Sequence, residues 1–312
     1  MKRVLVTGAN GFIGRHCLPM LLERGFEVHA VTHSRYAAVD LPDVHWNVTD
    51  LLDSRQVSSL FEDVRPTHLL HLAWYTVPNT YWTSLENLRW LQAGIDVMRA
   101  FKAHGGERVV FAGTCAEYDW QFGYCSEQLT PLAPATLYGV CKNALYQVLR
   151  SFSEQEDMSM AWGRIFFLYG PYEHTARLVP SVINSLLDGQ PVQCTHGNQI
   201  RDFSHVADVA SAFVAMLDGS VQGAVNIASG RAIRLKEVIG QIAEYFQRPD
   251  LIHLDSIPAP DNEAPLLLAD ISRLSREVHW FPAYNLASGL EMTIDWWKRR
   301  KKHGPENKLP GM

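Results

Sequence analysis

The sequence has no CxxC pair, and its cysteines are odd in number, so one is left over in any full disulfide pairing. They are Cys17, Cys115, Cys125, Cys141 and Cys194. Zinc ribbons and disulfide-stapled domains need paired cysteines, so both classes are disfavoured. The first residues also lack the uninterrupted apolar run and small-residue cleavage site of a secretory leader. We therefore expect reduced thiols, a cytoplasmic location and no metal site.

Long apolar runs and a strong net charge are missing as well. No stretch reaches the roughly 18–20 apolar residues that a transmembrane helix needs, so we expect no membrane span. A net charge of −5 on 312 residues gives no electrostatic reason to expect nucleic-acid binding. The basic cluster at 298–302 lies close to the C-terminus. We interpret it as a solvated helix end and assign 299–312 to a basic tail.

Strand-like and helix-like segments alternate through the first half of the chain. Apolar runs typical of strands occupy 4–8, 26–33, 67–74, 108–114 and 161–170. Amphipathic runs typical of helices lie near 12–24, 51–62 and 81–104, and another begins near Tyr138. Such alternation predicts parallel strands covered by helices. The expected fold class is α/β, with a Rossmann-type doubly wound parallel sheet and a smaller, interleaved C-terminal lobe.

The alternation breaks down after about residue 170. Prolines and short elements follow, and 224–229 is typical of a late return to the main sheet. The predicted dinucleotide-binding lobe comprises 1–170, with 198–229 returning to it. The predicted substrate-binding lobe comprises 171–197 and 230–298.

A glycine-rich loop follows the first strand. Gly8, Gly11 and Gly14 form the pattern GxxGxxG, which leads directly into a helix. Glycine lets the backbone turn sharply and approach a pyrophosphate, and the helix start adds free N–H groups and a positive dipole end. The strand before the triplet and the helix after it favour a dinucleotide-binding loop.

An acidic residue is missing where a plain NAD site usually has one. That residue ends the second strand and bonds the ribose 2′-hydroxyl. Here the strand is followed by His33, Ser34 and Arg35, and no carboxylate appears before Asp40. An arginine fork suits a 2′-phosphate, and the two neighbouring side chains can add hydrogen bonds. We therefore favour NADP(H) as the cofactor, with NAD(H) as the alternative.

Tyr138 and Lys142 are four residues apart and so share one face of a helix. A phenol with a pKa near 10 is a poor base at neutral pH, and a nearby ammonium is expected to lower that pKa. Thr114 ends the strand before this helix, where its hydroxyl can bond a reacting oxygen. With the glycine loop, these side chains predict proton transfer at an alcohol or ketone, coupled to hydride transfer by a nicotinamide.

With these motifs, the chain resembles the extended short-chain dehydrogenase/reductase family, particularly its nucleotide-sugar epimerase, dehydratase and reductase branch. The resemblance covers nearly the whole chain, with 7–14 matching TGxxGxxG and 71–74 matching HLAA. It implies cofactor contacts by Gly8, Asn10, Gly11, Phe12, Ile13, Gly14, Asn47, Val48, Leu72, Ala73, Trp74, Tyr138 and Lys142. Asn47 stands where the family has an adenine-contacting Asp, and it can still accept a hydrogen bond.

Two later motifs narrow the branch. The run 164–173 resembles the RxxNxYGPxQ of nucleotide-sugar members, and 200–210 resembles their RDFxxVxDVA. The resemblance implies that Arg201 meets a substrate diphosphate, although 259–263 has no arginine where the family often has one. The implied substrate contacts are Trp74, Thr114, Tyr138, Phe167, Arg177 and Arg201. Four aromatic residues lie between positions 74 and 82: Trp74, Tyr75, Tyr81 and Trp82. We expect them either to form an aromatic wall near the sugar or to pack under the long helix.

The residues after Thr114 bear on the type of reaction. Dehydratases of the family carry Thr-Asp-Glu, and members that epimerise at C3 or C5 place a cysteine two residues past the Ser/Thr. Here Cys115 and Ala116 follow, so both reactions are disfavoured, and Cys115 is interpreted as a core thiol. Whether Glu117 points toward the cleft stays open. Two reactions remain as candidates: the reduction of a 4-keto sugar with NADPH, and a C4 epimerisation that recycles NAD.

The missing acid after the second strand favours the reductase, and Phe167 in place of the family Asn supports it. In this hypothesis Tyr138 donates the proton, and Lys142 adjusts the pKa of the Tyr138 phenol and binds the nicotinamide ribose. Thr114 holds the carbonyl oxygen of a nucleotide-linked 4-keto-6-deoxy sugar. A 4-epimerase is the alternative. An inactive dinucleotide sensor is disfavoured, because a sensor needs no proton donor. The resemblance also implies a homodimer formed through two long helices.

Overall fold

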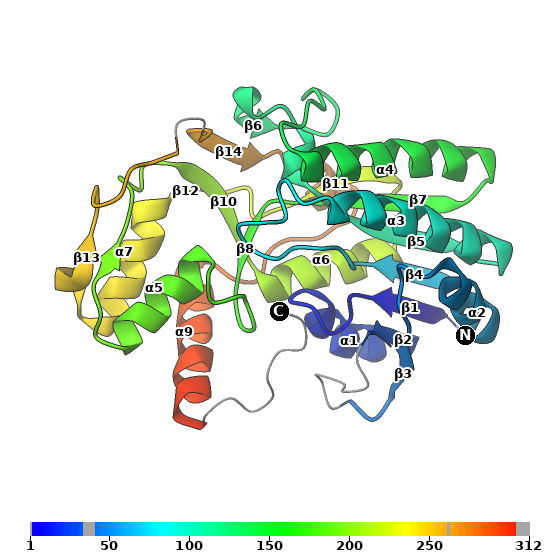
Figure 1. Cartoon of the computed structure of the whole chain (residues 1–312), viewed down its shortest axis with the longest axis horizontal. Coiled ribbons are helices and arrows are strands. Elements are labelled where there is room, and N and C mark those ends of the chain that lie inside the picture. The colour runs from blue at the N-terminus through cyan, green and yellow to red at the C-terminus, as the bar shows by residue number, and fades with distance from the viewer. Residues whose placement is uncertain (1, 34–40, 261–262, 304–312) are drawn as a thin grey trace.

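The protein, analysed as a computed structural model, is described for residues 2–33, 41–260 and 263–303. Seven parallel strands form its main sheet in the order β11-β7-β5-β4-β1-β2-β3 (Figure 1). Their bounds are β1 Arg3–Thr7, β2 Glu27–Thr32, β3 Val44–Val48, β4 His68–His71, β5 Arg108–Thr114, β7 Ser159–Ile165 and β11 Gly223–Ile227. The order reverses between β1 and β4, and open parallel sheets bind ligands beyond the carboxyl ends of the strands at such a reversal.

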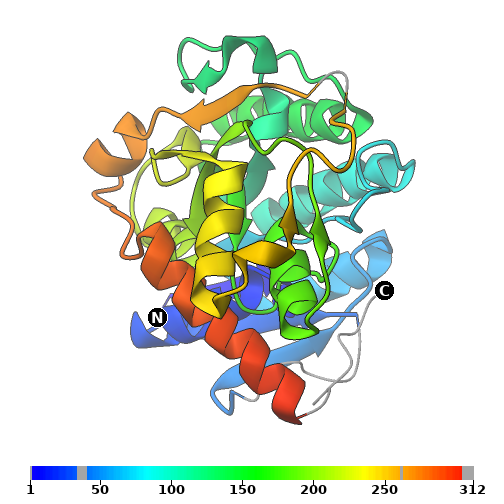
Figure 2. The ribbon, with the colours of Figure 1, turned by 90° about the vertical axis from the view of Figure 1, so that its left-hand side faces the viewer.

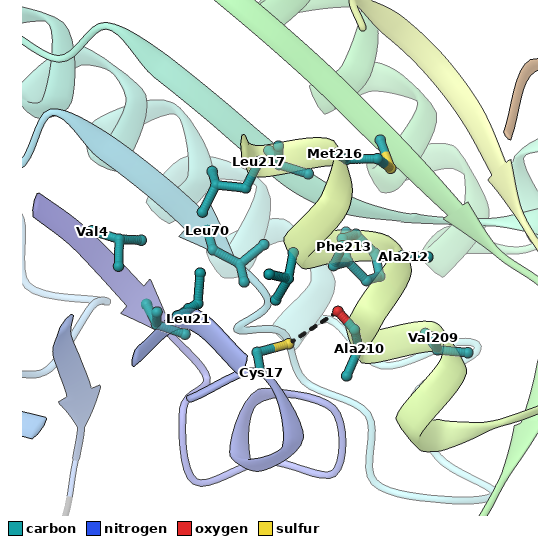
Figure 3. Packing of buried hydrophobic residues seen from close by; sticks show 14 of the residues in the cluster. Val4, Cys17, Leu21, Leu70, Val209, Ala210, Ala212, Phe213, Met216 and Leu217 are labelled. Atoms are coloured by element: carbon teal, nitrogen blue, oxygen red, sulfur yellow. Dashed lines mark hydrogen bonds between the residues drawn. The ribbon is translucent and has the colours of Figure 1, made fainter. Parts of the chain in front are cut away.

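Helices cover both faces of this sheet. One face carries α1 Gly14–Glu23 and α6 Val206–Asp218, and the other carries α2 Ser54–Val64, α3 Glu86–Ala103 and α4 Leu137–Gln155. Figure 3 shows the first layer, where Cys17 of α1 donates its thiol to Ala210 O of α6 at 3.8 Å. Each large apolar side chain fully buried in these layers contributes roughly 1.5–3 kcal/mol to stability.

A smaller, five-stranded sheet runs in the order β12-β10-β14-β6, with β8 pairing beside β10. Its bounds are β6 Tyr124–Cys125, β8 Phe167–Tyr169, β10 Ile200–His205, β12 Ala232–Arg234 and β14 Leu266–Ala269. Three helices and a two-stranded sheet pack together beside it, as Figure 2 shows: α5 Leu178–Leu187, α7 Leu235–Phe246, α9 Leu286–His303, β9 Val192–Gln193 and β13 Ile252–His253. The remaining elements are α8 Ser272–Arg276 and the 3₁₀ turns η1 Cys115–Glu117, η2 Trp120–Phe122 and η3 Pro249–Leu251.

The α/β fold with a parallel sheet is confirmed, but the run 161–170 is not the single strand predicted. It divides into β7 in the main sheet and β8 in the smaller one. The division comes at Phe166, whose N–H bonds Ile227 O at 3.2 Å before Phe167 pairs with Phe203 of β10. The strand β3 was not anticipated, because it lies at the sheet edge and its half-buried residues form no apolar run.

The return of 198–229 to the main sheet is made by α6 and β11, whereas β10 belongs to the smaller sheet. Asp208 on α6 accepts backbone N–H bonds from Ala283 at 2.9 Å and Tyr284 at 3.1 Å, and so ties α6 to the segment before α9. The helix α9 runs to His303, so the tail predicted from residue 299 begins as helix. The lobe boundaries themselves stay a prediction.

Two further features concern the environment of the chain. The five cysteines are all buried and free. Across the described ranges, no helix is both long and apolar enough to cross a membrane.

Candidate active site

The glycine loop between β1 and α1 is packed so tightly that its glycines have no substitute. Gly8 has a φ of +66°, and a Cβ there would lie 2.8 Å from Ala73 N. A Cβ on Gly14 would lie 2.2 Å from Gly8 O. The carboxyl ends of β1 and β4 therefore meet at this loop, with the start of α1 behind it. This cradle fits a dinucleotide pyrophosphate.

Polar contacts hold the loop in place. The Asn10 amide donates to Thr32 Oγ1 at 2.9 Å, and Arg15 donates to Asn10 O at 2.6 Å. Thr7 accepts the Ala73 N–H at 3.3 Å through its hydroxyl. The predicted contacts Gly8, Asn10, Gly11, Phe12, Ile13, Gly14, Leu72 and Ala73 thus lie on two adjacent strand ends and the loop between β1 and α1.

The predicted contacts to the adenosine end lie on neighbouring strands. Asn47 and Val48 end β3 and pair with Val31 and Thr32 of β2. His33 follows β2 and is exposed. The other two candidate phosphate contacts, Ser34 and Arg35, lie outside the described residues.

Tyr138 and Thr114 come together because α4 begins against the turn η1. A Cβ on Gly139 would lie 2.3 Å from Ala116 O, so this close approach requires glycine. Tyr138 N donates to Trp82 O at 3.1 Å, which fixes the start of the helix from the other side. Burial raises the pKa of Tyr138, the neighbouring Tyr81 phenol adds to the rise, and a hydrogen bond with Thr114 opposes it.

The lowering of that pKa expected from Lys142 is therefore not found. Lys142 is buried, donates to Ala112 O at 2.9 Å and lies 3.8 Å from the centre of the Trp74 ring. Burial lowers the pKa of Lys142 to about 7, and the negative charge of Glu117 opposes that change. Both catalytic candidates thus sit in a low-polarity environment that disfavours their charged forms.

Aromatic side chains surround the Tyr138 ring. Its centroid lies 4.9 Å from Tyr81, 5.7 Å from Trp82 and 6.4 Å from Trp74, each in an edge-to-face arrangement. Trp74 is held by Asn87 of α3, which accepts its indole N–H at 2.9 Å. Three of the four predicted wall residues therefore lie against the Tyr138 ring, and Tyr138 is only 8% exposed.

The side chain of Glu117, whose direction the sequence left open, turns into the core. Its carboxylate accepts hydrogen bonds from Thr114 N at 2.8 Å, Trp162 Nε1 at 2.9 Å and Arg164 Nε at 2.7 Å. The Thr-x-x-Glu spacing is the signature of a capping box, which was the available signal for the first of these contacts. Nothing local in the sequence indicates the partners on β7.

The predicted substrate contacts are spread more widely. Arg201 on β10 is buried, and its guanidinium binds Glu263 Oε1 at 2.9 Å and lies 5.4 Å from the Phe167 ring. Arg177 lies 5.2 Å from the Tyr81 ring and so reaches the aromatic group around Tyr138. Glu263 therefore occupies one nitrogen of the guanidinium that the family resemblance assigns to a substrate diphosphate.

One group of potential metal ligands lies apart from this site. Ligand atoms of Glu27, His29 and His45 on β2 and β3 lie within 4.8 Å of one another. Glu27 Oε1 already accepts hydrogen bonds from Arg3 Nε at 2.8 Å and His29 Nε2 at 3.0 Å. A guanidinium on the carboxylate opposes a cation there, so an arginine–glutamate–histidine cluster accounts for the arrangement.

Comparisons with known proteins agree with this geometry. Residues 4–228 match the model of the NAD dependent epimerase/dehydratase family. A dTDP-4-dehydro-6-deoxy-D-allose reductase of Streptomyces sp is 27% identical, over 96% of this chain and 98% of its own. Two solved structures are also similar. MoeE5 in complex with UDP-glucuronic acid and NAD is 29% identical with a TM-score of 0.83, and the match covers 95% of this chain and 99% of that one. The Thermus thermophilus UDP-glucose 4-epimerase in complex with NAD is 25% identical with a TM-score of 0.81, and the match covers 95% of this chain and 99% of that one.

The family match covers more than half of the chain and includes the glycine loop, Thr114, Tyr138 and Lys142. The similar crystal structures hold NAD, and one of them holds a nucleotide sugar as well. The resemblance drawn from the motifs is thus confirmed, and the chain belongs to the NAD dependent epimerase/dehydratase family of extended short-chain dehydrogenases/reductases.

Proposed function

We propose that this enzyme reduces the 4-keto group of a nucleotide-linked 4-keto-6-deoxy sugar with NADPH. Tyr138 donates its phenol proton to the carbonyl oxygen, Thr114 holds that oxygen, and Lys142 binds the nicotinamide ribose. When bound, the reduced nicotinamide supplies the hydride that the protein's own side chains lack. Among the relatives, the Streptomyces reductase of a 4-keto-6-deoxy sugar supports this activity by its name.

The observation that carries the proposal is the placement of the Tyr138 phenol beside the Thr114 hydroxyl, with Lys142 about one helical turn further along α4. Because burial and the neighbouring Tyr81 raise its pKa, the phenol keeps its proton at neutral pH. A protonated phenol next to Thr114 can give a proton to a carbonyl oxygen, which is the proton transfer that a reduction needs. This arrangement supports reduction as the proposed direction.

The cofactor preference rests on the end of β2. Thr32 ends the strand and His33 follows it, so the described part of this region has no carboxylate for a ribose 2′-hydroxyl. This absence supports NADPH. The similar crystal structures hold NAD, so the choice of cofactor is the first thing to measure.

A nucleotide-sugar 4-epimerase is the second candidate, favoured by the epimerase among the similar solved structures. An epimerase must first oxidise its substrate, so its tyrosine has to act as a base. It also returns the hydride to the same substrate, and no net cofactor is consumed. The two candidates therefore differ in stoichiometry as well as in the starting protonation of Tyr138.

Two accompanying proposals concern assembly and location. Leu88 on α3 and Val140 and Val148 on α4 are each about half exposed, which supports a homodimer through these helices. Light scattering should give the mass of two chains, and Val148→Glu should give the mass of one. The five buried free thiols support a location of the protein in the cytoplasm, where the environment is reducing.

Tyr138→Phe tests the proposed chemistry. We expect about a 10²- to 10⁴-fold loss of turnover, because the proton donor is removed. The readout is loss of reduced-nicotinamide absorbance with a 4-keto-6-deoxy nucleotide sugar, and cofactor binding is followed by tryptophan fluorescence. Tyr146→Phe, farther along the same helix, is the matched control and should keep its turnover. Undiminished turnover of Tyr138→Phe contradicts the mechanism.

A further inference from the structure

Glu117 is a fully buried carboxylate that the proposed chemistry does not use. Its side chain is 0% exposed, directly behind the strand end that carries Thr114. One carboxylate oxygen accepts from Thr114 N and Trp162 Nε1, and the other accepts from Arg164 Nε. A buried charge with this number of donors is fixed in position as well as compensated.

The first consequence of this arrangement is the orientation of Thr114. Glu117 accepts the Thr114 N–H at 2.8 Å, while Thr114 Oγ1 accepts the Ala116 N–H at 3.2 Å. These reciprocal bonds form a capping box on η1 and define the backbone and side-chain directions of Thr114. The hydroxyl is thereby held on the side of Tyr138, to which it is hydrogen-bonded.

The second consequence is electrostatic and concerns Lys142. Its ammonium donates to Ala112 O at 2.9 Å, and a Cβ on the next residue, Gly113, would lie 2.7 Å from Glu117 Oε1, so the lysine and the carboxylate approach the same strand end. The titratable and charged groups around Lys142 in the described chain are His71 on β4, Tyr138 on α4, and Glu117 with its partner Arg164. His71 is buried and neutral, because burial and the charge of Lys142 lower its pKa to about 3. Tyr138 is also neutral, so Glu117 is the negative charge that acts on the lysine.

The charge of Glu117 acts on both catalytic candidates in the same sense. It raises the pKa of Lys142 against the effect of burial, and it is among the groups that raise the pKa of Tyr138. The charge of Glu117 therefore favours the protonated form of each residue, while burial still lowers the pKa of Lys142 overall. A carbonyl reductase needs this combination at the start of its reaction: an ammonium at the ribose and a phenol with its proton in place.

We infer that Glu117 is a positioning residue of this site: it holds Thr114 in place and stabilises Lys142 as an ammonium. The role in turnover rests on the proposed function, but the charge coupling to Lys142 is a property of the protein alone. It can therefore be measured without cofactor or substrate.

The test is a titration of Lys142 by NMR on protein labelled with ¹³C at the lysine ε-carbons. Lys142→Arg identifies the signal, and wild type is compared with Glu117→Gln. We expect the midpoint of Lys142 in Glu117→Gln to fall by about one pH unit or more. Asp208→Asn is the matched control, because it also removes a buried carboxylate bonded to backbone N–H groups but lies on α6. It should leave the midpoint unchanged.

An unchanged midpoint in Glu117→Gln overturns the inference. Because a lone Gln would leave Arg164 uncompensated, the double variant Glu117→Gln/Arg164→Gln provides a second test if the single variant does not fold. It removes the buried pair as a unit and should again lower the midpoint, while an unchanged midpoint overturns the inference here too.

Turnover separates this inference from the proposed function. With an active substrate, the alkaline decline of kcat/KM should move to lower pH in Glu117→Gln, as the Lys142 midpoint does. Absence of turnover in every variant, together with a shifted midpoint, contradicts the proposed function and supports the inference. Normal turnover in Glu117→Gln, with an unshifted Lys142 midpoint and an unshifted pH profile of kcat/KM, supports the proposed function and contradicts the inference about Glu117.

Discussion

Two glutamate–arginine pairs differ in their access to water; the arginine of one lies on β7 of the main sheet, and that of the other on β10 of the smaller sheet. Glu117 and Arg164 beneath Thr114 are 2.7 Å apart, and their side chains are 0% and 1% exposed. Glu263 and Arg201 beside β10 are 2.9 Å apart, with a 4% exposed arginine but a 28% exposed glutamate. The first pair is sealed in the core, and the second is open on its acidic side.

Because of this difference, we expect the sealed pair to be needed for stability, and the arginine of the open pair to be able to exchange its partner. When a sealed pair loses one partner, the other charge remains buried without compensation. A partly exposed carboxylate can instead turn to water, so that its arginine becomes available to another anion. The sealed pair therefore holds the strand end that carries Thr114, and the open pair lies where the family resemblance implies a substrate diphosphate.

The largest expected effect breaks the sealed pair. Arg164→Met should lower the free energy of unfolding by about 3–5 kcal/mol, because Glu117 stays buried without its cation. Arg201→Met should cost about 1 kcal/mol, because Glu263 can be hydrated. Urea denaturation followed by tryptophan fluorescence measures both.

The double variant Glu117→Met/Arg164→Met is the control for this prediction. It should recover a large part of the stability lost in Arg164→Met, because no isolated charge remains. If the two arginine substitutions cost equal stability, the distinction between a sealed and an open pair is wrong.

Glu173 extends the comparison of buried glutamates, because it is buried with one carboxylate oxygen that has no hydrogen-bond partner. Burial raises the pKa of Glu173 to about 8, and the nearby Arg177 only partly opposes this. The folded state therefore keeps this proton, which the unfolded state loses near pH 4.5. Stability should fall as pH rises from about 4.5 to about 8, by at most about 1.4 kcal/mol per pH unit.

Glu173→Gln should remove this part of the pH dependence and be more stable than wild type at pH 8, with equal stability near pH 4. Urea denaturation across that range gives the slope. Glu62→Gln, an exposed site, should keep the wild-type slope. A wild-type slope in Glu173→Gln would show that the carboxyl group is ionised in the folded protein.

The smallest expected effect concerns the open pair. Glu263→Gln removes the carboxylate that competes for Arg201, so a nucleoside diphosphate such as dTDP or UDP should bind about 3- to 10-fold more tightly. Arg201→Gln should weaken the same binding. Isothermal titration calorimetry measures both, and weaker binding to Glu263→Gln would show that Glu263 supports the ligand.

Local patterns in the sequence predicted most of the frame. The glycine spacing placed the loop of Gly8 and Gly14, and the four-residue step placed Tyr138 and Lys142 on one helix face. Each of these rests on residues close together in the chain, where helix and strand periodicity is informative. The fold class and family that followed from them are confirmed.

The two charge pairs escaped prediction because they join distant parts of the chain. Glu117 and Arg164 are 47 positions apart, and Arg201 and Glu263 are 62 apart. Each contact depends on how separate strands are brought together, which no local spacing encodes. The raised pKa of Tyr138 was missed for a related reason, since the surrounding aromatic residues determine its burial, and burial is the largest cause of the rise.

We propose that the protein reduces its substrate at one carbon, with net consumption of cofactor and with Tyr138 as proton donor. The most direct measurement uses NADPH carrying deuterium at both positions of nicotinamide C4, with a 4-keto-6-deoxy nucleotide sugar as substrate. We expect mass spectra to show a 4-hydroxy product with one deuterium at C4, and one NADP⁺ formed per product. Interconversion of two nucleotide sugars that differ at C4, without net formation of oxidised cofactor, would contradict it.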